Sequence, residues 1–428
     1  MGITFMLLGL LALIVINIPI AVALAIIGAA GTYLSYGAHA LPEISLVLFD
    51  GSTNFSLLAI PLFIFAGAIM NNSSLARRLI DLTTALLGFI RGGLAMVTIG
   101  ASAFFAEISG SAVAGVAALG TVLIPAMEKK GYSREFAAAI SSSAASLAII
   151  LPPSIPMILY AVMAQESIVK MFIAGVLPGI MGALGLALMA YYQARKKNFP
   201  VEAKFQVSRL VKTLREAFWA LTIPVIILGG IFGGFVTATE GAGLAVLVAL
   251  VISGIIYREL SFKKLYDCCV QSGIQTAVVM LLVAASALVG SYLTQARLPQ
   301  ELAAGIESFS TNKYVILMIM NVFFLILGMF LHSAAAIILV IPIVMPLVHA
   351  VGIDPVHFGL IVTINLAIGQ QTPPVASVLI TACSIAKSDI WRTTRANLGF
   401  IGVLLVVLLV NTYLPDISLS LVRLVYGS

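Results

Sequence analysis

Residues 370–374 of this chain, Gln-Gln-Thr-Pro-Pro, interrupt a long apolar stretch with groups that could bind an ion or a polar molecule. A proline has no backbone N–H, so Pro373 and Pro374 leave carbonyl oxygens one turn earlier, around Gly369, without helical partners. The residue before a proline is also pushed out of helical geometry. Freed carbonyl oxygens can coordinate Na⁺, and glutamine amides can donate to anionic oxygens. The pattern predicts a broken helix that faces a ligand; a simple kink is the alternative.

A second Pro-Pro pair, Pro152 and Pro153, is the only other one in the sequence. The stretches "IPAMEKKGYSREFAAAISSSAASLAIILPPS" and "MPLVHAVGIDPVHFGLIVTINLAIGQQTPPV" align without a gap, and each contains its pair at the same place. The first stretch has apolar residues 149–151 where the second has Gln-Gln-Thr. The chain therefore contains an internal repeat, and we expect the polarity of the site to come mainly from the second half.

Membrane helices must position these two breaks. The chain has 428 residues, of which 61% are hydrophobic and 9% charged, and its mean hydropathy is +1.13. A soluble domain carries roughly 25% charged residues. The apolar runs are long enough for helices of about 20 residues, whereas strands of a membrane barrel alternate apolar and polar residues. The composition predicts an all-α polytopic membrane protein.

The positions of Lys and Arg predict the topology. They gather around residues 77–91, 129–134, 195–215, 258–264 and 387–395, and such basic loops favour the cytoplasmic side. This requires the segments 93–127 and 314–348 to enter and leave on the same side, from opposite faces. Each is short for two full spans, which need about 40 residues. We therefore expect two re-entrant hairpins in an inverted repeat, with two thin ordinary spans each as the alternative.

The predicted hairpin tips carry small and hydroxyl residues. They read "EISGSAVAG" over Glu107–Gly115 and "MFLHSAAA" over Met329–Ala336. Non-helical backbone at membrane depth is tolerated only inside protein or against a cavity, and helix N-termini there favour anions. Ser109 and Ser111 could instead be packing residues, His332 could be hydrogen-bonded in the interior, and Glu107 is a functional candidate because ionisable groups are costly in lipid.

These motifs resemble the large membrane subunit of TRAP (tripartite ATP-independent periplasmic) transporters. The resemblance covers nearly the whole chain, and its most specific elements are "IPLFIFAGAIM" (Ile60–Met70), "EISGSAVAGVAALG" (Glu107–Gly120), "LPPSIP" (Leu151–Pro156), "GGFVTATEGAG" (Gly233–Gly243) and "GQQTPPV" (Gly369–Val375). It implies an elevator mechanism, in which two hairpins and two broken helices move past a scaffold. It also implies Na⁺-coupled uptake of an organic anion, with sialic acid favoured and a C4-dicarboxylate as the other candidate.

The resemblance also implies the residues of the site. Two or more Na⁺ ions are expected where hairpin tips face the helix breaks. The first Na⁺ site takes Ser109, Gly110, Ser111, Pro152 and Pro153, and the second takes His332, Ser333, Gly369, Gln370 and Thr372. Substrate is expected between them, in contact with Ser111, Ser154, Gln370, Gln371 and Thr372. The tips here lack the asparagine of the Ser-Asn-Thr motif in related dicarboxylate carriers, so substrate contacts at the tips are expected to differ.

The implied partners are a small membrane subunit, a periplasmic substrate-binding protein and the lipid bilayer of the bacterial inner membrane. Nucleic acid is not expected, because the basic residues lie in several loops rather than in one patch. The expected organisation is scaffold helices with a cytoplasmic amphipathic arm in 1–92, a first transport repeat in 93–193 with its broken helix at 136–164, a basic cytoplasmic loop in 194–216, scaffold helices with an outer arm in 217–310, and a second repeat with the last helix in 311–428, its broken helix at 355–385.

Other functions fit less well. A one-component Na⁺/dicarboxylate carrier would have the same architecture and remains the alternative. A channel would need a filter loop or a ring of charge, and an ATP-driven pump would need a nucleotide motif that the sequence lacks. An intramembrane serine protease would need His332 to reach Ser109 or Ser111, on the tip of the other hairpin. Thr239 with Glu240 is expected only to cap a helix.

Overall fold

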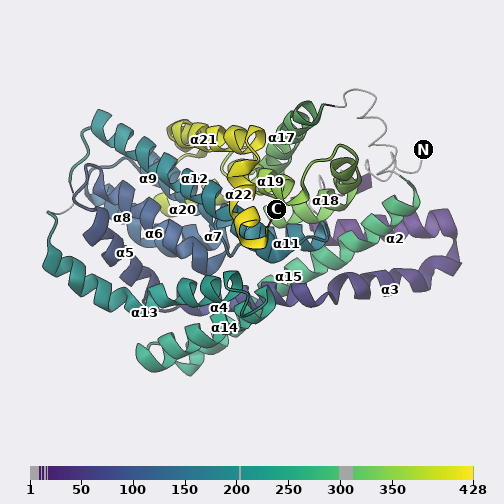
Figure 1. Cartoon of the computed structure of the whole chain (residues 1–428), viewed down its shortest axis with the longest axis horizontal. Coiled ribbons are helices and arrows are strands. Elements are labelled where there is room, and N and C mark those ends of the chain that lie inside the picture. Colours follow the sequence, from purple (N-terminus) through teal and green to yellow (C-terminus); the bar gives the residue numbers. More distant parts are fainter. Residues whose placement is uncertain are drawn as a thin grey trace.

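The structure, a computed structural model, describes residues 9–10, 12–13, 16, 18–201, 204–297 and 312–427. Within these residues the regular structure is helical apart from one isolated β-bridge between Arg91 and Val201. Nine helices in this part are long and apolar enough to cross a membrane, or up to ten if the bent pair Ala38–Ser52 and Phe55–Asn71 is one span. The predicted all-α polytopic membrane fold is confirmed (Figure 1).

One group of helices comes from the beginning and the middle of the chain. It comprises α2 (Ile20–Tyr36), η1 (Ala38–Ala40), α3 (Leu41–Ser52), η2 (Phe55–Leu58), α4 (Ala59–Asn71), α5 (Leu75–Leu87), α13 (Val207–Phe232), α14 (Ala238–Leu250), η4 (Val251–Ile256) and α15 (Phe262–Gln295). Within it, α15 packs on α2, α3 and α4, while α14 packs on α4 and α13 packs on α5. In Figure 1, α13, α14 and α3 follow the lower edge of the molecule.

The second group comes from both repeats. It comprises α6 (Gly93–Ser109), α7 (Ala112–Gly115), η3 (Val116–Gly120), α8 (Thr121–Lys129), α9 (Arg134–Ala145), α10 (Leu147–Ile150), α11 (Ile155–Met163), α12 (Ile168–Lys196), α17 (Lys313–Phe330), α18 (Ser333–Ala350), α19 (Pro355–Gly369), α20 (Ser377–Ala386), α21 (Ile390–Tyr413) and α22 (Asp416–Tyr426). Here α9 packs on α20 and α21, and α17 packs on α19. The groups meet where α5 and α4 contact α6 and where α15 contacts α18. A division into scaffold and moving repeats stays a prediction.

Both predicted hairpins form. The first consists of α6 followed by α7, η3 and α8, and it turns at Gly110 and Ser111. The second consists of α17 and α18, and it turns at Leu331 and His332. Gly110 has a positive φ of 57°, which a residue without a side chain adopts at little cost. The first tip is therefore tight, as its small residues predict, whereas the second tip turns at larger residues and its small residues lie in the first turn of α18.

The hairpins open at opposite ends of the molecule. The segment just before α6 pairs through Arg91 with Val201, which follows α12. Tyr314, near the start of α17, packs on the last residue of α21, with ring centroids 5.8 Å apart. Helices α12 and α21 run antiparallel, because the first half of α21 contacts the end of α12 at Gly399 and Gln193. The two hairpins thus enter from opposite faces, which confirms the inverted repeat.

Both Pro-Pro pairs break their helices. Between α10 and α11, Leu151 takes an extended ψ of 136° and the chain leaves the helix until Ile155. Between α19 and α20, the chain is non-helical from Gln370 to Ala376, which has a positive φ of 46°. A proline stops the preceding helix because it removes a donor and crowds the residue before it.

Two segments differ from their predicted structure. The basic loop expected over 194–216 is shorter, because α12 continues to Lys196 and α13 already begins at Val207. Lys and Arg are good helix formers, so a basic segment does not have to be a loop. The cap of α14 is Thr237 rather than Thr239, and Thr237 and Glu240 form a capping box. The predicted outer arm falls mostly outside the described residues.

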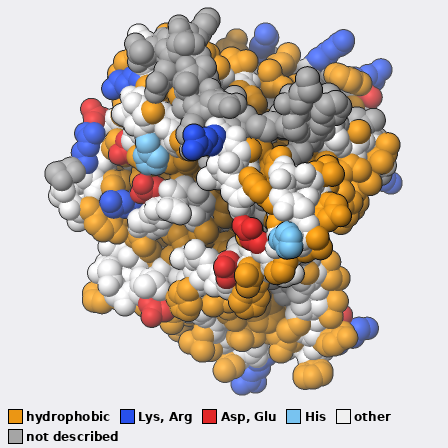
Figure 2. All heavy atoms as spheres, turned by 90° about the vertical axis from the view of Figure 1, so that its right-hand side faces the viewer, with side chains coloured by type: hydrophobic (Ala, Val, Ile, Leu, Met, Phe, Trp, Pro, Cys, Tyr) orange, Lys and Arg blue, Asp and Glu red, His pale blue; other side chains and the backbone are white. Residues whose placement is uncertain are grey.

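The outer surface suits a bilayer. Figure 2 shows hydrophobic side chains over much of the face formed by the right-hand side of Figure 1. Exposed apolar residues include Leu188, Val225 and Phe323 on three different helices. The predicted cytoplasmic arm is α5, which buries Leu79 and Ile80 while Arg77 on the same helix is exposed. This amphipathic helix is typical of a segment at a membrane surface.

Candidate functional site

A cavity of about 730 Å³ lies where the two hairpin tips meet. Its lining comes from both repeats and from the first group of helices. The polar residues of the lining are Asn71, Ser109, Ser111, Gln271, Gln275, His332, Ser333 and Gln370. No Lys, Arg, Asp or Glu of the described residues lines it. The cavity is thus a mostly apolar pocket with a few polar groups, which is the usual form of a small-molecule site.

The first hairpin tip rests on the first helix break. The carbonyl of Gly110 accepts a hydrogen bond of 3.4 Å from the N–H of Ile155, the first residue of α11. A Cβ atom added to Gly110 would lie 3.1 Å from the carbonyl oxygen of Pro153. The Ser111 hydroxyl accepts from the Ala114 N–H and caps α7. The tip and the break therefore form one compact unit with hydroxyl and carbonyl oxygens at the cavity.

The second tip repeats this arrangement. The carbonyl of Met329 accepts a hydrogen bond of 3.1 Å from the N–H of Val375, directly after the second Pro-Pro pair. Gly328 and Gly369 touch backbone to backbone, because a Cβ on Gly369 would lie 2.5 Å from the Gly328 Cα. His332 caps α18 through its Nδ1 atom, which accepts from the Ala334 N–H at 3.4 Å. The N-terminus of α18 thus points at the cavity and favours an anion there.

Three buried polar atoms at the cavity have no hydrogen-bond partner in the described part of the chain. They are the Ser333 Oγ, the Gln370 Nε2 and the Asn71 Oδ1. The side chains of Ser333 and Gln370 are each only 1% exposed. Buried polar groups in native proteins are almost always hydrogen-bonded to protein or water. Three unpaired groups around one cavity therefore indicate a place where a polar ligand binds.

The neighbouring amide of Gln371 points away from the cavity. Its Oε1 accepts from the hydroxyl of Ser143 at 2.6 Å and from the Asn397 Nδ2 at 3.2 Å. Its Nε2 donates to Ser146 Oγ at 2.8 Å and to the carbonyl of Ala367. Gln371 is therefore outside the cavity lining, because consecutive residues at a helix end point in different directions. Its predicted substrate contact stays a prediction that this arrangement does not favour.

Two other predicted substrate contacts also lie outside the cavity lining. The hydroxyl of Thr372 donates to the carbonyl of Ile368 at 3.0 Å. The hydroxyl of Ser154 donates to the carbonyl of Ile149 at 2.9 Å, and its side chain is fully buried. The Ser154 hydroxyl satisfies a carbonyl that Pro153 leaves without a helical donor, whereas the carbonyl of Ile368 also accepts from the N–H of Gln371 at 3.1 Å. Both hydroxyls therefore have backbone atoms as direct partners. Glu107 is half-buried in α6 and also lies outside the lining.

The structure brings most of the predicted residues together. Ser109, Gly110, Ser111, His332, Ser333 and Gln370 all line the cavity, while Pro152, Pro153 and Gly369 lie behind the tips. The prediction missed Asn71 in α4 and the pair Gln271 and Gln275 in α15. These two glutamines are one helical turn apart in a long apolar helix, and that spacing was a usable signal.

The sequence is similar to a large set of known transport proteins. A sequence profile of the family described as "Tripartite ATP-independent periplasmic transporter, DctM component" matches residues 7–417. The chain is 39% identical over 407 residues to "Isethionate TRAP transporter permease protein DctMQ" of Oleidesulfovibrio alaskensis, which covers 95% of this chain and 64% of that protein. It is 37% identical over 390 residues to "C4-dicarboxylate TRAP transporter large permease protein DctM" of Pseudomonas aeruginosa, covering 91% of both.

Two further similarities extend this finding. The chain is 36% identical over 404 residues to "2,3-diketo-L-gulonate TRAP transporter large permease protein YiaN" of Escherichia coli, covering 94% of this chain and 95% of that protein. Among solved structures it is similar to the Alcanivorax borkumensis YdaH transporter, whose description reports an unusual topology. The TM-score is 0.65 at 15% identity, over 95% of this chain and 97% of the other. This last similarity shows the fold alone.

Proposed function

This chain belongs to the DctM family of tripartite ATP-independent periplasmic transporters, and we propose that it takes up a small organic anion together with Na⁺. As a large permease it is a secondary transport protein of the bacterial inner membrane. The main observation behind the proposed uptake of an anion with Na⁺ is the uncharged cavity between the two hairpin tips. It is bordered by the unpaired polar atoms of Ser333, Gln370 and Asn71.

An organic anion suits this cavity for an electrostatic reason. A carboxylate there would meet the N-terminus of α18 and the free amide donor of Gln370, without a buried cation that would bind it too tightly. The relatives are named for isethionate, C4-dicarboxylate and 2,3-diketo-L-gulonate, which all carry a carboxylate or sulfonate. We propose a substrate of this class. Sialic acid is a narrower hypothesis that the names of these three relatives do not support.

Sodium is the coupling ion in this proposal. Na⁺ prefers neutral and anionic oxygen ligands, and unwound helices supply them in transporters. The carbonyl of Pro153 against Gly110 and the hydroxyl of Ser109 are such oxygens at the first tip, and Ser333 is one at the second. These oxygens of the first break and of both tips suit Na⁺, and bound Na⁺ would add positive charge beside the substrate anion.

The proposed mechanism is an elevator movement with two partner proteins. Each tip would move with its own break past α4 and α15, because the N–H of Ile155 donates to the carbonyl of Gly110 and the N–H of Val375 donates to the carbonyl of Met329. The two repeats would move together, because α9 packs on α20 and α10 packs on α19. A small permease subunit would brace α5 and the other helices of the first group. A periplasmic binding protein would deliver the substrate to the cavity.

Reconstitution in liposomes tests this proposal. We expect uptake of labelled isethionate, succinate or sialic acid only when the chain, its small permease and its binding protein are all present, and only with an inward Na⁺ gradient. Liposomes in which K⁺ replaces Na⁺ are the control for coupling. Uptake that continues without Na⁺ would reject the coupling, and robust uptake by the purified chain alone would favour a one-component carrier.

A further inference from the structure

A second cleft, of about 650 Å³, lies at the basic end of the molecule, where α5, α13 and η4 meet. It is lined by Arg78, Ser208, Val211, Lys212, Arg215, Glu216, Trp219, Ile256 and Tyr257. Three of these residues carry a positive charge and one carries a negative charge. The cleft is open to the surface, is far in sequence from the hairpin tips and shares no lining residue with the central cavity.

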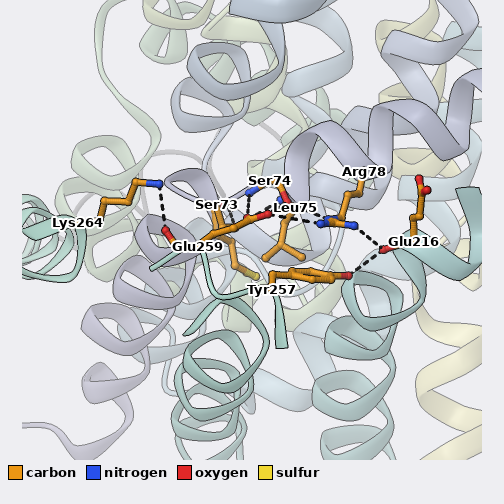
Figure 3. A network of polar contacts seen from close by, with 9 residues as sticks. Ser73, Ser74, Leu75, Arg78, Glu216, Tyr257, Glu259 and Lys264 are labelled. Carbon is orange, nitrogen blue, oxygen red and sulfur yellow. Dashed lines mark hydrogen bonds and ion pairs between the residues drawn. The ribbon is translucent and has the colours of Figure 1, made fainter. Parts of the chain in front are cut away.

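Arg78 is fixed at the inner wall of the cleft. Its Nε donates to the hydroxyl of Ser74 at 2.9 Å, and its guanidinium forms an ion pair with Glu259 at 3.4 Å. The guanidinium also lies over the ring of Tyr257, 3.9 Å from the ring centroid (Figure 3). The Tyr257 hydroxyl donates to the carbonyl of Glu216 at 2.9 Å. These contacts join α5, η4 and α13. They hold the guanidinium of Arg78 in one position at the wall of the cleft.

Lys212 and Arg215 contribute the remaining positive charge. They lie three residues apart in α13, on the same face as Ser208 and Trp219, and both line the cleft. Neither forms an ion pair within the described part of the chain. Glu216 also lines the cleft and Glu259 pairs with Arg78, so three positive and two negative charges leave an excess of one positive charge there. Two exposed cations without partners on one face indicate a site for an anion.

The position of the cleft in the membrane identifies the kind of anion. Trp219 is 43% exposed at the cleft, and aromatic residues of this kind prefer the level of the lipid headgroups. About two turns further along α13, on the same face as Trp219, Ile226 is 41% exposed, as a lipid-facing residue would be. The amphipathic helix α5 lies on the other side of the cleft, with its apolar face buried. The cations of the cleft are therefore at headgroup depth, with apolar surface directly beneath.

We propose that this cleft binds the phosphate headgroup of an anionic phospholipid of the cytoplasmic leaflet. Lys212 and Arg215 contact the phosphate, Arg78 supplies a fixed positive charge behind it, and Trp219 packs against the glycerol and the first acyl carbons. The bound lipid links α5 to α13 and holds the arm against the membrane surface. This inference is independent of the transported substrate.

Lipid binding to the purified full chain tests the proposal. Native mass spectrometry would measure binding of phosphatidylglycerol and of phosphatidylethanolamine to the wild type, to Lys212→Gln/Arg215→Gln, and to Arg195→Gln/Lys196→Gln. The control pair removes the same charge from exposed residues at the end of α12, outside the cleft. Each basic residue near a bilayer contributes about 1 kcal/mol of attraction to anionic lipid, so we expect the cleft variant to bind phosphatidylglycerol at least about tenfold more weakly.

The expected pattern is a preference for phosphatidylglycerol in the wild type and the control pair, and its loss in the cleft variant. Equal losses in the two variants would mean general surface attraction and would overturn the site, as would no loss in either. Inorganic phosphate is added in a separate arm. If millimolar phosphate displaces the lipid from the wild type, the cleft is a site for a soluble phosphate compound, and the lipid proposal is rejected.

Discussion

Gln370 and Gln371 are neighbours in the chain, yet only the amide of Gln370 borders the central cavity, while that of Gln371 is bonded to Ser143, Ser146 and Asn397. The two side chains therefore have different roles. One is placed to bind a ligand, and the other joins α9, α19 and α21 across the break.

Leucine substitutions should separate these roles. Gln370→Leu removes the unpaired Nε2 donor and one 3.3 Å hydrogen bond from the Ser377 hydroxyl to Oε1, so we expect apparent substrate affinity about ten- to a hundredfold lower and a smaller loss of stability than in Gln371→Leu. Gln371→Leu leaves several buried polar groups unpaired, which costs about 1–3 kcal/mol each, so we expect a lower unfolding temperature. Uptake against substrate concentration and thermal unfolding in detergent are the two measurements. Equal effects of both variants on affinity and stability would contradict this division.

A methyl group at Gly369 should disrupt the second tip. The added Cβ would lie 2.5 Å from the Gly328 backbone, so α17 and the break would have to separate. We expect Gly369→Ala to lose uptake and to unfold at a lower temperature.

Gly402→Ala is the matched control, because Gly402 lies within α21 and, apart from its chain neighbours and the nearby backbone of the same helix, no atom of the described structure is within 4 Å of its added Cβ. Alanine in an open helical position is favoured over glycine by about 0.5–1 kcal/mol, so this variant should retain uptake and stability. If Gly369→Ala behaves like Gly402→Ala, the close contact has no role in the site.

Much of this architecture could be predicted from the sequence, because its signals are local. Pro-Pro pairs break helices wherever they occur, and small residues such as Gly110 mark tight turns. The Lys and Arg residues of a loop likewise indicate on their own which side of the membrane the loop faces. The part that could not be predicted depends on direction and distance. The sequence gives no sign that Gln371 faces Asn397, since that contact joins helices from separate segments. Likewise Asn71 reaches the cavity only because α4 packs on α6.

Hydroxyl removal at the tips tests the proposed Na⁺ sites. Ser111 and Ser333 line the cavity, and the Ser333 hydroxyl is unpaired, so Ser111→Ala and Ser333→Ala should each raise the Na⁺ concentration that gives half-maximal uptake. Thr372→Ala is the comparison, because the Thr372 hydroxyl donates to Ile368 and lies outside the lining. Its Na⁺ dependence should change least. Unchanged Na⁺ dependence in both serine variants would remove the two hydroxyls from the ion sites.

The carboxylate of Glu259 should make stability depend on pH. Partial burial raises its pKa, but hydrogen bonds from the hydroxyl and N–H of Ser74, together with Arg78, outweigh this and lower the pKa below its ordinary value of 4.5. A lowered folded-state pKa means that the stabilisation is fully present above the unfolded-state pKa and is lost as pH falls through the folded-state pKa. The wild type should therefore unfold at a higher temperature than Glu259→Gln at pH 7, by an amount that reflects a partly exposed ion pair of no more than about 1 kcal/mol. The difference between the two unfolding temperatures should begin to shrink as pH falls below the ordinary pKa of 4.5, and it should be lost once pH is below the lowered folded-state pKa. Asp416→Gln is a control, because Asp416 pairs with Arg423 at the exposed surface of α22, and its removal should change the unfolding temperature little at either pH. A difference between wild type and Glu259→Gln that stays constant from pH 7 to pH 3.5 would show that the ionised carboxylate does not hold α5 to the loop before α15.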